Sequence, residues 1–279
     1  MRRLLNDMLW LLLPFAILLA LNIAGTGLPT GPLLAVWLLL TAVMFAGLWT
    51  RALSRRHAFL SAYMHAGSVW RRRWRGGPLL AGAQLVQAAL LAVVLLVAVV
   101  RLDDTAAWRV LLVGLPLLVL LHGLLRRWMV PHVSPLYLPE LSWRLTLRLN
   151  FLLMFPALAL AALYVSYPAL AEVTLKQAIW NEMIRQEASS QALLGLMQVA
   201  AAKDALGWWL GQQLLPGLGE PLFQLGGWLL LLAAEGLFLW SYLVLVAGTL
   251  DLVHWRRRPP LPTLTSAVEN SKGPVGERG

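Results

Sequence analysis

Apolar residues recur along this chain in long runs, separated by short stretches of turn-forming or charged residues. A helix that crosses a bilayer needs about 20 consecutive apolar residues. The pattern therefore predicts an all-α polytopic membrane protein with six transmembrane helices and both termini on the cytoplasmic side. The predicted spans are residues 8–24, 32–50, 78–100, 108–125, 149–167 and 223–248.

Residues 1–258 form a single transmembrane domain in this prediction, and the polar residues 259–279 form a mobile tail. Segment 168–222 is the only long extracytoplasmic stretch, and we expect two or three short helices there, between spans 5 and 6. Lys203 and Asp204 interrupt a possible seventh span over 192–210. Such a span would also move the arginines after span 6 outside, against the positive-inside rule, so we reject it.

The segment 51–75 is strongly basic. It contains no Asp or Glu and seven arginines, namely Arg51, Arg55, Arg56, Arg71, Arg72, Arg73 and Arg75. Arginines beside membrane spans are retained in the cytoplasm, so this segment orients the whole chain. Its apolar residues share one side of a helical wheel, which predicts a cytoplasmic helix lying on the membrane surface. We expect its arginines to contact anionic lipids of the inner leaflet or a cytoplasmic protein partner.

Composition agrees with a membrane protein, since 59% of the residues are hydrophobic and only 13% are charged. A soluble domain would contain about a quarter charged residues. The net charge of +10 is explained by the arginines that orient the spans in the membrane, so we expect no nucleic-acid partner. The chain has no cysteine, which excludes disulfides, thiolate nucleophiles and Cys-ligated clusters. Phosphate-binding loops and common hydrolase motifs are also missing, and we expect no enzymatic activity, catalytic residue, metal or cofactor.

Glu235 is the one acid deep inside a predicted span, near the middle of span 6. An ionised acid at the centre of an isolated span costs about 2.5–3.5 kcal/mol, so it should face protein or water. Thr41 in span 2 and Gln87 in span 3 are the expected partners. Two interpretations stay open: a proton or substrate site, and a structural acid that joins two helices.

His122 is the only histidine in a predicted span. Haem held by two histidines would need a second one at the same depth, so we expect His122 to form hydrogen bonds near the inner membrane interface. The other histidines lie in predicted cytoplasmic segments, and their spacing matches no compact metal motif.

Three functions remain open. The first is a scaffold or accessory subunit of a multi-protein envelope complex, with other protein subunits as partners. The second function rests on the order of the elements along the chain. This order resembles that of ABC-2-type export permeases, with six spans, a surface helix after span 2 and short helices before span 6. The resemblance implies a separate ATPase as a partner. The third is a proton-coupled carrier or channel that uses Glu235. The excess of arginine over lysine favours a bacterial inner membrane as the location.

Overall fold

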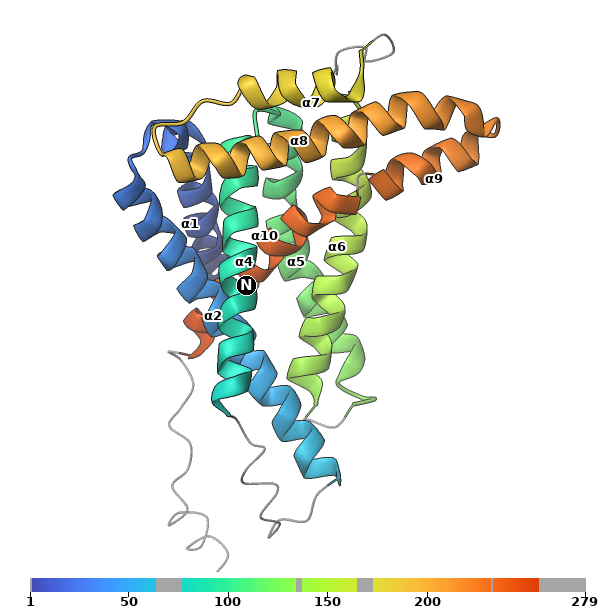
Figure 1. The fold of residues 1–279 in the computed structure, drawn as a ribbon. Helices are drawn as coiled ribbons and strands as arrows, with labels where there is room; N and C mark the ends of the chain where they lie inside the picture. Colours follow the sequence, from blue (N-terminus) through green and yellow to red (C-terminus); the bar gives the residue numbers. More distant parts are fainter. Residues whose placement is uncertain (1, 64–76, 134–136, 165–172, 232, 256–279) are drawn as a thin grey trace, which may run out of the picture.

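The protein is built from helices that form a bundle, with a layer of helices across one end (Figure 1). The structure is a computed structural model, and it describes residues 2–63, 77–133, 137–164, 173–231 and 233–255. No strand occurs among these residues, so the all-α prediction is confirmed for them.

Six helices are long and apolar enough to cross a membrane, which agrees with the predicted number. They are α1 (Arg2–Ala24), α2 (Thr30–Tyr63), α4 (Pro78–Val100), α5 (Thr105–Met129), α6 (Leu138–Tyr164) and α10 (Ala233–Trp255). Their apolar windows are Leu9–Gly27, Thr30–Arg56, Pro78–Val100, Thr105–Met129, Leu141–Ala162 and Glu235–Val253. All six windows overlap the predicted spans, and together they indicate a multi-pass membrane protein.

The predicted sixth span, 223–248, covers parts of two described helices, α9 (Pro221–Leu231) and α10 (Ala233–Trp255). Residue 232, between them, lies outside the described residues. The apolar window Glu235–Val253 overlaps this predicted span. Trp228 of α9 packs against Trp208 of the helix before it, with ring centroids 5.0 Å apart.

Helix α10 is the centre of the bundle. It packs against α1, α2, α4 and α6, and in Figure 1 it runs behind α4 through the middle of the molecule. Residues 241–247 are each at most 2% exposed. A helix that is apolar all round is stable only when neighbours enclose it, which matches this position.

Three helices cross one end of the bundle, and we call them the crossing layer: α7 (Leu175–Ile184), α8 (Gln191–Leu214) and α9. Thr174 and Gln177 form a capping box at the start of α7. Ser190 caps α8 by accepting a hydrogen bond from the backbone N–H of Leu193. With 24 residues, α8 is longer than the short helices predicted for this segment.

The crossing layer is hydrogen-bonded to the bundle beneath it. The backbone N–H of Ser189 donates to the carbonyl oxygen of Thr26, at 2.8 Å, in the turn between α1 and α2. The hydroxyls of Ser190 and Thr30 lie 3.1 Å apart. These contacts hold the start of α8 against the turn that joins the first two spans.

Helix α2 continues well beyond the predicted span. It runs unbroken for 34 residues, or about 51 Å at 1.5 Å per residue, while the hydrocarbon core of a bilayer is about 30 Å thick. No glycine or proline occurs in 48–63, so nothing ends the helix there. The predicted separate surface helix over 51–75 is therefore wrong for residues 51–63, and 64–75 lie outside the described residues.

Candidate functional site

Glu235 lies where α10 meets the crossing layer. It is in the first turn of α10, and its Oε1 is 2.8 Å from Nζ of Lys203 on α8. Glu235 is the third residue of α10 and the first of its apolar window, Glu235–Val253. Residue 232, just before α10, lies outside the described residues, so the place of Glu235 near the middle of a span stays a prediction.

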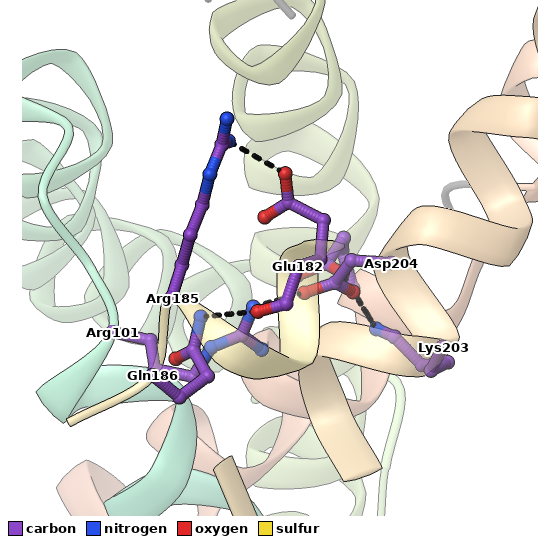
Figure 2. Close-up of polar contacts among 7 residues, drawn as sticks. Arg101, Glu182, Arg185, Gln186, Lys203 and Asp204 are labelled. Atoms are coloured by element: carbon purple, nitrogen blue, oxygen red, sulfur yellow. Dashed lines mark hydrogen bonds and ion pairs between the residues drawn. The ribbon is translucent and has the colours of Figure 1, made fainter. Parts of the chain in front are cut away.

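The Lys203–Glu235 pair belongs to a larger ion network, whose members are Arg101, Lys203, Asp204 and Glu235. Nζ of Lys203 also lies 2.8 Å from Oδ1 of Asp204, and Nη2 of Arg101 lies 2.8 Å from Oδ2 of Asp204 (Figure 2). Arg101 is the C-cap residue of α4, where the helix dipole favours a cation. The ion network therefore joins the end of α4, the middle of α8 and the start of α10.

The ammonium of Lys203 is held in its charged form by this network. Burial acts to lower the pKa of Lys203, but the carboxylates of Glu235 and Asp204 act to raise it, and the net result is a pKa above the ordinary 10.5. A raised lysine pKa contributes stability below pH 10.5 that is lost as the pH rises through the folded value. The ion network is thus intact across the neutral range.

Figure 2 also shows a pair of a different kind on α7, where Nη1 of Arg185 lies 2.8 Å from Oε1 of Glu182. The two residues are three positions apart on one helix, and the arginine side chain is largely exposed. Exposed pairs within one helix contribute only about 0.3–0.5 kcal/mol. This pair supports α7 locally and does not join separate helices.

The expected partners of Glu235 lie elsewhere. Thr41 is buried on α2, and its hydroxyl has no hydrogen-bond partner among the described residues. Gln87 is exposed on α4. The structure therefore brings Glu235 together with Lys203 and not with Thr41 or Gln87. Sequence reasoning had assigned Lys203 to a segment outside the membrane and did not consider it as a partner.

His122 lies between α5 and α6. Its ring meets the ring of Trp143 edge-on, with centroids 4.6 Å apart. Nδ1 of His122 is 3.4 Å from the hydroxyl of Thr146, and that hydroxyl donates to the carbonyl oxygen of Ser142 at 2.7 Å. The Thr146 oxygen can therefore accept from His122, which places a hydrogen on Nδ1. In these contacts His122 joins two helices.

Sequence reasoning missed a stripe of buried polar residues on α6. Ser142, Thr146 and Asn150 are all 0% exposed. The side-chain amide of Asn150 donates to the carbonyl oxygen of Gly114 on α5, at 3.3 Å. The signal was available, because polar residues at every fourth position of an apolar helix share one face. The stripe helps to pair α5 with α6.

Arg51, which the basic segment predicts to contact lipid or a protein partner, forms an ion pair within the chain. Its Nε lies 3.0 Å from Oδ2 of Asp251 on α10, and the side chains are only 11% and 24% exposed. One turn earlier, Gly47 and Gly248 let the two helices approach so closely that a Cβ on Gly47 would lie 2.6 Å from Cα of Gly248. This close crossing brings Arg51 and Asp251 together.

The other arginines of the basic segment divide into two groups. Arg55 is exposed on α2, with its Nε 3.4 Å from the carbonyl oxygen of Arg51, and Arg56 is half-buried. Four more lie outside the described residues: Arg71, Arg72, Arg73 and Arg75. Lipid or partner contact by these six residues stays a prediction.

Most of the polar contacts described above join helices to one another, the others support single helices, and none forms a recognisable reaction centre. Within the described ranges, no three His, Cys, Asp or Glu side chains are grouped so that they could hold a metal ion. Comparison of the chain with protein-family models, with curated proteins and with solved structures finds no match.

Proposed function

We propose that this protein is an integral membrane subunit of a multi-protein envelope complex, with the role of a scaffold or accessory component. The observation that carries this proposal is the enclosed central helix, since residues 241–247 of α10 are at most 2% exposed. A helix packed on all sides serves the stability of the bundle. The surfaces left for other molecules are the outer face of the bundle and its two ends.

A proton-coupled carrier is less well supported. Such a carrier needs an intramembrane acid that alternates between two solvent-facing states. Glu235 lies instead at the first turn of α10, with Lys203 as its partner. This contact favours the structural interpretation, in which Glu235 joins α8 to α10.

The orientation is part of the proposal. Arg51, Arg55 and Arg56 lie on the part of α2 that runs away from the crossing layer, and this basic end should face the cytoplasm. The crossing layer, with both acidic and basic side chains, should then face outward. We place the protein in a bacterial inner membrane with both termini inside.

Cysteine labelling tests the orientation directly, because the chain has no native cysteine. The exposed positions Glu187 and Ser54 lie in the crossing layer and on the distal part of α2. A membrane-impermeant maleimide should label Glu187→Cys in intact cells, and should label Ser54→Cys only after the membrane is opened. The cysteine-free parent is the control. Labelling of Ser54→Cys in intact cells would invert the proposed topology.

Purification in mild detergent tests the proposed role. The tagged protein should retain a set of envelope proteins at a constant ratio to itself, as mass spectrometry would measure. Membranes from cells that express the tag on an unrelated six-span protein provide the control. Recovery of the protein alone, as a monomer or homo-oligomer, would contradict the proposal.

The same experiment addresses a second candidate, a permease subunit that resembles ABC-2-type exporters in layout. Two observations favour it: α2 continues to Tyr63, beyond its apolar window Thr30–Arg56, and in the described part of the chain α7, α8 and α9 lie between the fifth and sixth candidate spans. The extension of α2 would give a separate ATPase a surface to contact. An ATPase recovered at a constant ratio would make this the leading function.

A further inference from the structure

Helices α8 and α9 form a hairpin in which residues of one helix pack against residues of the other. A Cβ on Gly211 of α8 would lie 2.5 Å from the Trp228 ring of α9, so this ring packs directly against the glycine. The Trp228 ring in turn lies 5.0 Å from the Trp208 ring. The two helices therefore contact each other through these residues.

The hairpin extends sideways past α6, and α9 lies nearer to the middle of the bundle than α8 does (Figure 1). Part of α9 is open to its surroundings, since Leu222 is 77% exposed and Phe223 is 63% exposed. The chain then passes from α9 into α10, one of the six helices that can cross a membrane.

The charge pattern of the hairpin is unusual for a segment surrounded by water. Residues 205–234 contain a single charged side chain, Glu220. Glu220 lies in the turn between the helices, where its carbonyl oxygen accepts hydrogen bonds from the backbone N–H groups of Phe223 and Gln224. The only charge in this stretch is therefore at the tip, and both arms are uncharged.

We infer that this hairpin lies in the bilayer interface, with α9 among the lipid acyl chains and the tryptophans at headgroup level. Tryptophan is enriched at that level because its ring is apolar and its N–H is polar. Helix α9 is not one of the six described helices that are long and apolar enough to cross a membrane. It is thus a partly inserted helix that faces lipid, and this placement does not depend on which complex the protein serves.

The test uses depth-dependent fluorescence quenching on the full chain. Phe223→Cys and Leu222→Cys are each labelled with an environment-sensitive fluorophore and reconstituted into vesicles of phosphatidylcholine and phosphatidylglycerol. Both labels should emit at shorter wavelength than in water and lose most of their emission when the phosphatidylcholine carries a nitroxide on its acyl chain. Aqueous iodide should quench them little.

Glu187→Cys, in the loop before α8, is the matched control, and its label should respond to iodide and not to the acyl nitroxide. Gel filtration confirms that each labelled variant is folded. Labels at 222 and 223 that respond to iodide like the control would show that the hairpin stands in water. Labels shielded from both quenchers would show that protein, such as a second copy of the chain, covers α9. Either result would overturn the inference.

Discussion

Replacing Arg51 with methionine should lower the free energy of unfolding by about 3–5 kcal/mol. The change leaves the carboxylate of Asp251 without the guanidinium that lies 3.0 Å away, in a place where only 24% of the aspartate side chain is exposed. Breaking such a buried pair is costly because the remaining charge keeps its desolvation penalty. Unfolding of the purified protein by titration with a denaturing detergent measures the loss.

Two further variants separate this effect from a general loss of arginine. Arg55→Met changes the same residue type one turn further along α2, but at an exposed position, and should change stability by about 0.5 kcal/mol or less. Arg51→Met combined with Asp251→Leu removes both charges, and should recover most of the lost stability. A double variant as unstable as Arg51→Met would show that the ion pair is not the cause.

Gly248→Ala should also destabilise the protein, by about 1–3 kcal/mol, through overpacking of the α2–α10 crossing. A Cβ on Gly248 would lie 2.6 Å from the carbonyl oxygen of Val43. That atom belongs to the backbone of α2, so no side-chain rotation relieves the clash and the helices must separate. Small residues at helix crossings in membranes allow this close approach. The same detergent titration measures the effect.

Gly123→Ala on α5 is the control, for which we expect no loss of stability. A Cβ at position 123 would meet nothing within 4 Å. Alanine is favoured over glycine in a helix interior by up to about 1 kcal/mol, so this variant should be as stable as the parent or more stable. If Gly248→Ala behaved like Gly123→Ala, the tight crossing of α2 and α10 would be refuted.

Substitutions at the two glycines and at the Arg51–Asp251 ion pair should have coupled effects on stability. Gly47 and Arg51 are four residues apart on α2, and Gly248 and Asp251 are three apart on α10, so each pair shares a helix face. Separating the helices at Gly248 should therefore weaken the Arg51–Asp251 contact as well.

Hydropathy predicted the first five spans from the sequence because insertion into a bilayer depends mainly on each segment's own apolar content. Local chemistry explains the start of α8, because the hydroxyl of Ser190 accepts a hydrogen bond from a backbone N–H in the first turn. Hydropathy could not show that Glu235 pairs with Lys203, because that contact joins residues 32 positions apart in the chain.

The sequence by itself thus determined the membrane class, the number of candidate spans, and Glu235 and His122 as polar residues that need partners. Only the tertiary structure decided the partners: Lys203 for Glu235, Asp251 for Arg51 and Thr146 for His122. The physical reason is that the free-energy cost of burying a charge is a property of the residue type, which the sequence shows. The group that offsets this cost depends on which helices are adjacent. Adjacency follows from packing between distant segments, such as the contact of Gly47 with Gly248.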